Sequence, residues 1–388
     1  MPQVKPQFEA FARIKVVGIG GGGNKAIQRM MVHKIHGVEF VAVNLDAQDL
    51  NIANAPTKIL IGKNLTRGLG AGMNPELGRQ AAQESIDEIG DVLKGSDMVF
   101  ITAGLGGGTG TGAAPIIAEV ARDVGALTVG VVTKPFSFEG VARARIADEG
   151  WVLLRDKVDA LITISNDRLL SIIDRKTPLL EAFQKVDDVL RQGVQGISDL
   201  ITIPGIINVD FADVKTIMAN SGSALMGIGF ASGEDRAIEA AKAAISSPLL
   251  DISIDGARGV LFNVSGGADL AMSEINEAAR VITSNIDSEA KVIFGAVQDD
   301  TLNKGEIKVT VIAAGFNSLE AKAHKTHLTE VLFGGMLPVN GKRIGEIDER
   351  QPMMQKKVKE KTVEGEVVDT SVDEGEFDIP AFIRRKIK

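Results

Sequence analysis

Apolar and polar positions alternate in short runs along the first half of the chain. From residue 13 to about residue 174, apolar runs typical of buried strands are separated by segments whose spacing predicts helices. The strand-like runs are Ile14–Gly18, Phe40–Val43, Met98–Thr102, Leu127–Val132 and Ala160–Ser165, and the clearest helix-like segments are Asn24–His33 and Pro75–Leu93. This alternation predicts an α/β fold with a parallel, Rossmann-like sheet, whose ligand loops lie at the carboxyl ends of its strands.

One long amphipathic segment follows this region. Between Pro178 and Ile203, apolar residues recur every three or four positions without an internal proline, which predicts a single helix about 35 Å long. Beyond it, Gly222–Phe316 predicts a smaller α/β unit with helices at Gly233–Ile245 and Asp269–Thr283 and strands at Gly259–Val264, Lys291–Val297 and Glu306–Ala313. Residues 346–376 mix charges with few large apolar side chains, as expected of a disordered linker.

The stretch Gly106–Gly112, GGGTGTG, is the strongest chemical signal in the chain. It follows the strand-like run Met98–Thr102 and precedes a helix-like run, Ala113–Val124. Glycines bring bare backbone N–H groups close to a ligand, and the start of a helix attracts anions. The two threonine hydroxyls add donors that a flexible linker lacks, so we expect this loop to hold a phosphate.

A second glycine-rich loop, Gly18–Gly23, has the spacing GxGxxG between a strand and a helix. Alone it favours a dinucleotide such as NAD, with Asp46 at the end of the next strand as the ribose ligand. Two such loops on one sheet instead suggest a nucleoside triphosphate. Neither loop fits GxxxxGK[ST], so the chain is not expected to be a P-loop NTPase.

The composition narrows the classes of partner. At 388 residues and a net charge of −8, the chain is long enough for two or three domains and is not a general binder of nucleic acid. The absence of cysteine excludes disulfides, thiolate nucleophiles and cysteine zinc sites. No run approaches the ~18 apolar residues of a membrane span, and the first residues lack a signal core, so we expect a cytoplasmic protein.

Two acidic residues, Asp210 and Asp213, come just after the long helix. Three positions apart at a helix start, they are placed to orient a water or a hydrated cation, or they serve only as an N-cap and a favourable first-turn acid. If the long helix starts beside the nucleotide, the acids lie roughly 35 Å away from it. They would then act on the nucleotide of a neighbouring molecule in a head-to-tail stack.

Several motifs together resemble the bacterial cell-division branch of the tubulin/FtsZ family of GTPases. GGGTGTGAAP at Gly106–Pro115 is similar to the family's signature loop. GLGAGMNPELG at Gly68–Gly78, TKPFSFEG at Thr133–Gly140 and NVDFADV at Asn208–Val214 match the family in order and spacing. DIPAFIRRK at Asp378–Lys386 is similar to the tail motif of bacterial members.

The resemblance assigns roles residue by residue. From the residues alone, Phe183 fits the core face of the long helix equally well, and Asp187 its solvated face. Lys25 is a departure, because the family commonly has a second asparagine there. The implied nucleotide contacts are Gly21, Gly22, Gly23, Asn24 and Lys25 from the first loop, Gly106, Gly107, Gly108, Thr109, Gly110 and Thr111 from the second, Ala71 and Gly72 near the γ-phosphate, Glu139 and Arg143 at the ribose, and Asn166, Phe183 and Asp187 at the guanine.

The resemblance also implies a mechanism and partners. Asn208, Asp210 and Asp213 would complete the GTPase site of the next subunit in trans, with GTP or GDP and Mg²⁺ as cofactors but no side chain that can be assigned as a direct metal ligand. Head-to-tail protofilaments would build a contractile ring at the division septum. Asp378, Ile379, Pro380, Phe382 and Ile383 would bind membrane-tethering and regulatory division proteins, without insertion into the membrane and without nucleic acid.

The resulting division of the chain has eight parts. They are a flexible N-terminus (1–12), a GTP-binding domain (13–177), a central helix (178–203), the catalytic loop with its following helix (204–221), a C-terminal α/β activation domain (222–316), a C-terminal extension (317–345), a disordered linker (346–376) and a partner-binding peptide (377–388).

Overall fold

The computed structural model describes residues 12–35, 37–170, 177–203, 205–247, 253–299 and 302–316. The predicted extension, linker and tail peptide lie outside the described residues. So do the predicted partner-binding residues Asp378, Ile379, Pro380, Phe382 and Ile383.

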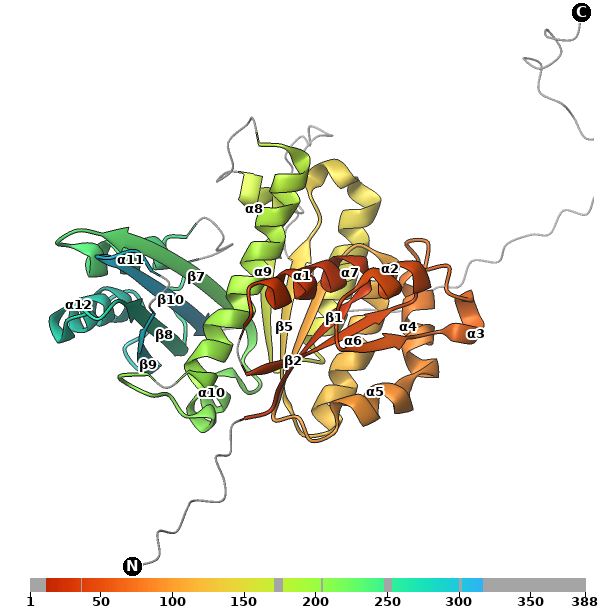
Figure 1. Ribbon diagram of the computed structural model, residues 1–388, viewed down its shortest axis with the longest axis horizontal. Helices are drawn as coiled ribbons and strands as arrows, with labels where there is room; N and C mark the ends of the chain where they lie inside the picture. Colours follow the sequence, from red (N-terminus) through yellow and green to blue (C-terminus); the bar gives the residue numbers. More distant parts are fainter. Residues whose placement is uncertain are drawn as a thin grey trace, which may run out of the picture. The chain divides into compact units, whose positions relative to one another are not determined.

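Ten strands of the described chain form one continuous sheet in the order β3-β2-β1-β4-β5-β6-β7-β10-β8-β9 (Figure 1). All neighbours from β3 to β7 are parallel, whereas β10 is antiparallel to both β7 and β8. The predicted α/β class with a parallel sheet is therefore confirmed. The strands are β1 Ile14–Ile19, β2 Val38–Asn44, β3 Thr57–Leu60, β4 Met98–Gly104, β5 Leu127–Lys134, β6 Ala160–Ser165, β7 Gly222–Ser232, β8 Gly259–Gly266, β9 Lys291–Gln298 and β10 Glu306–Ala314.

The helices cover both faces of this sheet. The predicted long helix is confirmed as α9, and the predicted Pro75–Leu93 helix is instead two helices that meet at Ser85, whose backbone leaves the helical region (φ −105°, ψ 21°). The helices are α1 Gly20–Val32, α2 Ala47–Ile52, α3 Lys63–Thr66, α4 Pro75–Glu84, α5 Ile86–Leu93, α6 Gly108–Asp123, α7 Val141–Arg155, α8 Asn166–Leu170, α9 Leu179–Thr202, α10 Phe211–Met218, α11 Arg236–Ile245 and α12 Met272–Thr283, with a short 3₁₀ helix at Ser137–Glu139.

Both glycine loops run directly into helices. We predicted helix starts at Asn24 and Ala113, but α1 begins at Gly20 and α6 at Gly108, inside the loops. The glycines therefore form the first turns, whose N–H groups have no partner within the helix. This shift moves the helix N-termini to the carboxyl ends of β1 and β4.

Strand β7 is long and was not predicted. Its glycines explain why it was missed, because Gly227 and Gly229 interrupt the apolar pattern and are needed for packing. A Cβ atom on Gly227 would lie 1.9 Å from the Ala244 carbonyl oxygen, and one on Gly229 would lie 2.0 Å from that of Ala240. The alanine-rich helix α11 thus packs directly against bare backbone of β7.

Helix α9 lies against the sheet between the N-terminal strands and β7–β10 (Figure 1). It buries Val186, Leu190, Val194, Ile197 and Leu200 in a core shared with α1, α10 and β5. Among the helices of the described ranges, none is both long and apolar enough to cross a membrane.

Candidate functional site

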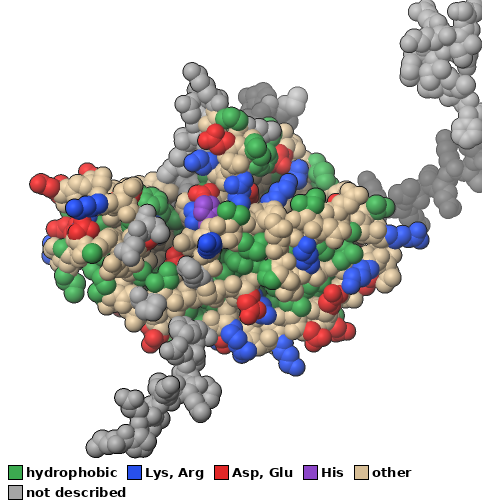
Figure 2. Space-filling model, in the orientation of Figure 1, with side chains coloured by type: hydrophobic (Ala, Val, Ile, Leu, Met, Phe, Trp, Pro, Cys, Tyr) green, Lys and Arg blue, Asp and Glu red, His purple; other side chains and the backbone are tan. Residues whose placement is uncertain are grey.

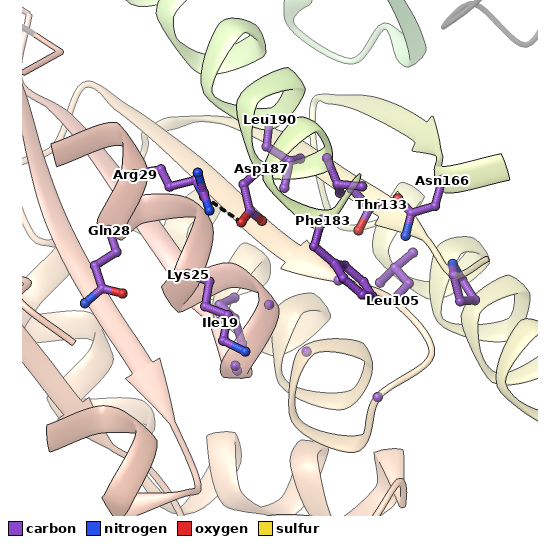
Figure 3. Close-up of a pocket in the computed structure, with 18 of the residues that line it drawn as sticks. Ile19, Lys25, Gln28, Arg29, Leu105, Thr133, Asn166, Phe183, Asp187 and Leu190 are labelled. Carbon is purple, nitrogen blue, oxygen red and sulfur yellow. Dashed lines mark hydrogen bonds and ion pairs between the residues drawn. The ribbon is translucent and has the colours of Figure 1, made fainter. Parts of the chain in front are cut away.

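A pocket of about 880 Å³ opens at the carboxyl ends of β1, β4, β5 and β6. The starts of α1 and α6 form one side of it, and the first half of α9 forms another (Figure 3). Figure 2 shows basic side chains gathered where α1 meets α9. The lining includes the basic side chains Lys25, Arg29, His33 and Arg143 but only two carboxylates, Glu139 and Asp187. Although the whole chain is acidic, this pocket suits an anion.

The two glycine loops touch inside the pocket. Gly20 has a left-handed backbone (φ 68°), and a Cβ atom there would lie 3.1 Å from the Gly110 backbone nitrogen. Only glycine permits this approach, which brings the N-termini of α1 and α6 together. Two helix N-termini pointing at one space form a binding site for phosphate groups.

The segment around Ala71 supports the second loop from outside the pocket. A Cβ atom on Gly108 would lie 2.7 Å from Ala71 Cβ and 2.8 Å from the Asn74 nitrogen. Ala71 is buried and Gly72 has a positive φ of 54°, but neither lines the pocket as described. Asn74 in turn caps α4 by accepting from the Glu76 N–H at 3.0 Å. Helix α4 and the loop before it therefore fix the start of α6.

Three predicted guanine contacts line the opposite end of the pocket. Phe183 is 39% exposed and meets the Phe136 ring edge-on at 5.6 Å, so it is not a core residue. Asn166 is buried, and its Oδ1 has no hydrogen-bond partner among the described residues. Asp187 accepts from Arg29 Nε at 2.9 Å, so its carboxylate is not a solvated surface acid (Figure 3). Burial raises the pKa of Asp187, although the charges of Arg29 and Lys25 oppose that rise.

Glu139 and Arg143 form an ion pair at the rim. Glu139 Oε2 lies 3.0 Å from Arg143 Nη1, and Glu139 Oε1 accepts from the Phe136 N–H at 3.0 Å. Buried Arg143 Nε has no partner among the described residues. The ion pair with Glu139 therefore leaves the Nε–H donor of Arg143 unused within the described residues.

Besides Ala71 and Gly72, four predicted contact residues do not line the pocket: Gly23, Asn24, Gly106 and Thr111. Gly23 is a packing residue, because a Cβ atom there would lie 2.3 Å from the Thr102 carbonyl oxygen. Thr111 Oγ1 accepts from the Gly106 N–H at 2.9 Å and so stabilises the loop itself. Asn24 is 3% exposed, and neither atom of its amide has a partner among the described residues. Asn24 therefore has unused donors and an acceptor close beneath the first loop.

Asp46 has a structural role. Its Oδ1 accepts from the N–H groups of Gln48 and Asp49 at 2.9 and 3.2 Å, which caps α2. It is absent from the pocket lining, so the expected ribose ligand of an NAD enzyme is not in place.

The acidic loop lies at the other end of α9. Figure 1 shows α10 at the foot of α9, away from α8, where Asn166 lines the pocket. Asn208, Asp210 and Asp213 are exposed. Asn208 Oδ1 accepts from the Gly205 N–H at 2.6 Å. Asp210 occupies the N-cap position of α10, yet its carboxylate accepts no capping hydrogen bond. The N-cap interpretation thus holds for the backbone of Asp210 and not for its side chain.

Comparison with known proteins agrees with this geometry. The family model "Tubulin/FtsZ family, GTPase domain" matches residues 13–174, and "FtsZ family, C-terminal domain" matches residues 222–317. A solved structure of an empty FtsZ dimer from M. jannaschii is 49% identical, with a TM-score of 0.76 over 79% of this chain and 89% of that one. The chain belongs to the tubulin/FtsZ family. The fold extends to GDP-bound CetZ1 from Haloferax volcanii, at 21% identity, a TM-score of 0.70 and coverage of 82% of this chain and 99% of that one.

Membership of the tubulin/FtsZ family supports binding of a guanine nucleotide, and the basic pocket suits such an anion. Proteins of this family bind GTP or GDP, and membership of the family implies GTP hydrolysis. Arg29 is the main pocket residue that sequence reasoning missed. The partner of Arg29, Asp187, is 158 positions away in the sequence. The only nearby indication that Arg29 belongs to the pocket was its position one helical turn after Lys25, on the same face of the helix.

Proposed function

We propose that this chain is a GTPase that assembles head to tail and hydrolyses GTP in a site shared by adjacent subunits. The supporting observation is the separation of two halves along α9. Phe183 and Asp187 line the pocket from the first turns of this helix, whereas Asp210 and Asp213 follow its last turn. The helix has 24 residues, so its ends are about 36 Å apart. The acids are thus too far from the pocket of their own chain.

Exposed apolar side chains at both ends support stacking of subunits. Large exposed apolar residues surround the nucleotide end: Leu69 (85%), Met73 (46%), Phe138 (64%), Val141 (87%) and Leu180 (71%). At the other end Ile206, 64% exposed, stands beside the acidic loop. Apolar surface of this kind is typical of protein interfaces. Because the two ends differ, repeating the contact builds an open filament.

In the shared site, one or both carboxylates would orient a water and accept its proton. The water oxygen attacks the γ-phosphorus while the bond to the β–γ bridging oxygen breaks, which yields GDP and phosphate. The helix N-termini, Lys25 and Arg143 would hold the phosphates, since phosphoryl transfer depends mainly on positioning and electrostatics.

Mg²⁺ would be held in this site mainly by the phosphates of the nucleotide. In the described ranges no three His, Asp or Glu side chains are grouped as a metal site. Mg²⁺ commonly binds substrate phosphates and retains several waters, so a protein cage is not required. When bound, the ion neutralises charge on the phosphates.

We further propose that the filaments form the contractile ring at midcell and recruit other division proteins through residues 377–388. This part rests on the tail motif and on the family, whose M. jannaschii relative was solved as a dimer. A short peptide that carries apolar residues such as Phe382 and Ile383 can fold into the groove of a partner.

The direct test combines light scattering with phosphate release, using GTP, GDP or NAD. We expect scattering and turnover with GTP alone. Scattering without phosphate release would indicate a non-hydrolysing polymer, and binding of NAD would indicate a Rossmann oxidoreductase. The absence of GTP-dependent scattering at micromolar protein would contradict the proposal.

A mixing experiment tests the shared site. Asp210→Ala should lose most turnover but keep GTP binding, whereas Gly108→Ser should lose binding because a side chain there meets Ala71 and the backbone of Asn74. Each variant should be inactive alone, and mixing them should restore activity at interfaces that join an intact loop to an intact pocket. Asp91→Ala removes an equally exposed acid on α5 and should change nothing. No recovery on mixing would mean that the site is not shared.

A further inference from the structure

Lys25 is a cation without a partner in the nucleotide pocket. Arg29 pairs with Asp187 and Arg143 pairs with Glu139, whereas Lys25 has no ion pair or hydrogen bond with any described residue. Its side chain is exposed, and it lines the pocket together with both glycine loops. An ammonium that forms no ion pair, placed beside two helix N-termini, strengthens the attraction for an anion.

The position of Lys25 on α1 directs its side chain toward these loops. Helix α1 starts at Gly20, so Lys25 lies in its second turn, and long helical side chains lean toward the N-terminus. Figure 3 shows Lys25 extending into the pocket near Ile19, while Arg29 turns to Asp187. Lys25 therefore lines the pocket on the side where α1 begins, together with both glycine loops.

We propose that the Lys25 ammonium contacts the α- and β-phosphates of the bound guanine nucleotide and raises the affinity for GTP and GDP alike. The inference rests on the guanine-nucleotide binding of the proposed function. The γ-phosphate is expected near Ala71 and Gly72, which support the far side of the second loop at Gly108. The phosphates nearer the base are therefore those within reach of α1. Lysine binds phosphate as a point charge, a role that the asparagine common in the family lacks.

Two other roles for Lys25 are less well supported. Its charge favours the ionised form of Asp187, but Arg29 Nε already occupies that carboxylate at 2.9 Å. A contact with the guanine base would require the side chain to turn away from the loops and toward Phe183. In either of these roles, Lys25 would affect the binding of guanosine, which has no phosphate, as much as that of GTP or GDP.

The test measures dissociation constants for GTP, GDP and guanosine at protein concentrations below assembly, in low and high salt. The variants are Lys25→Asn, Lys25→Arg and, as the matched control, Lys242→Asn, which removes the same charge from an exposed site on α11. We expect Lys25→Asn to weaken GTP and GDP about tenfold in low salt, the loss of one charge-assisted contact. Guanosine binding should not change, and added salt should reduce the difference. Lys25→Arg should retain most of the affinity, and Lys242→Asn should match the parent.

Three results would overturn the inference. Lys25→Asn that binds GDP as tightly as the parent would show that the ammonium makes no useful contact. An equal loss for guanosine would place Lys25 at the base. A parent chain that binds no guanine nucleotide would overturn the proposed function and this inference together, whereas the first two results leave the proposed function intact.

Discussion

Replacing Gly112 with alanine would place a methyl group where α6 meets α4. A Cβ atom on Gly112 would lie 1.9 Å from the Pro75 carbonyl oxygen and 2.8 Å from the Arg79 nitrogen. Ordinary contact begins near 3.4 Å, so the two helices must separate by about 1.5 Å. Across the same contact, a Cβ atom on Gly78 would lie 2.3 Å from the Gly108 carbonyl oxygen. Neither helix can therefore relieve the overlap by rotating a side chain.

The magnitude follows from two opposing effects. Overpacking a core costs about 1–3 kcal/mol of stability. The upper end of that range applies here, because the added methyl group meets backbone atoms, which cannot move aside as a side chain can. An alanine inside a helix is more favourable than glycine by about 1 kcal/mol. We expect a net loss of about 2 kcal/mol in the free energy of unfolding.

The same displacement should impair the nucleotide site. Asn74 is the N-cap of α4, and its backbone lies so close to Gly108 that a Cβ atom there would be 2.8 Å from the Asn74 nitrogen. Separating α4 from α6 by about 1.5 Å therefore shifts the phosphate loop, and a misplacement of about 1 Å is already enough to lower turnover about 100-fold.

Urea unfolding without nucleotide and GTP turnover together test this reasoning. The matched control is Gly90→Ala in α5, which faces the same helix α6 but whose added Cβ would lie 3.8 Å from Val120 Cγ1, an ordinary contact. We expect this control to gain up to about 1 kcal/mol through helix propensity and to keep its turnover. If Gly112→Ala were as stable and as active as the control, close packing of α4 would not be what holds the phosphate loop.

Three further changes test other parts of the molecule. Burial raises the pKa of Asp187 above its ordinary value of 3.8, so its carboxylate takes up a proton while the pH is still above 3.8. GDP affinity should therefore begin to weaken before the pH falls to 3.8, and Asp187→Asn should remove this pH dependence. Arg236→Met should lower the free energy of unfolding by about 3 kcal/mol, because the buried guanidinium pairs with Glu274 and Asp269. Pairing lowers the pKa of Glu274 below its ordinary 4.5, so this contribution is present at neutral pH and is lost as the pH falls below 4.5, which urea unfolding at neutral and acid pH would show. Phe183→Ala should weaken GDP binding by about 1–3 kcal/mol in a fluorescence titration, the range for base stacking on an aromatic ring, with little loss of stability.

In the parallel part of the sheet, the sequence predicted β1, β2, β4, β5 and β6 but neither the four-residue strand β3 nor β7. Strands covered by helices on both faces form continuous apolar runs, and β1, β4, β5 and β6 all have this pattern. Strand β7 was not predicted, because glycines replace apolar residues where α11 packs closely against it. The break between α4 and α5 at Ser85 was not predicted either, since the helical spacing of apolar residues continues across it.

The phosphate half of the site could be predicted because it is local. A few consecutive glycines determine where the backbone can approach a ligand, and those residues are adjacent in the sequence. The base half depends on contacts between distant segments. The pairing of Arg29 with Asp187 and the edge contact of Phe183 with Phe136 have no counterpart in sequence spacing. Without the family resemblance, Phe183 and Asp187 could not have been distinguished from ordinary core and surface residues.

In the shared site that we propose, helix α9 separates the nucleotide pocket from the acidic loop of the same chain. Its packing leaves little clearance, because a Cβ atom on Gly196 would lie 2.9 Å from Thr310 Cγ2, and one on Gly193 would lie 3.2 Å from Val131 Cγ1. A helix held this closely cannot bend enough to bring its two ends together. If Asp210 acts on a phosphate, that phosphate must therefore belong to another molecule. Hydrolysis would then require assembly, and any change that shortens or kinks α9 should alter the fit between subunits before it alters nucleotide binding.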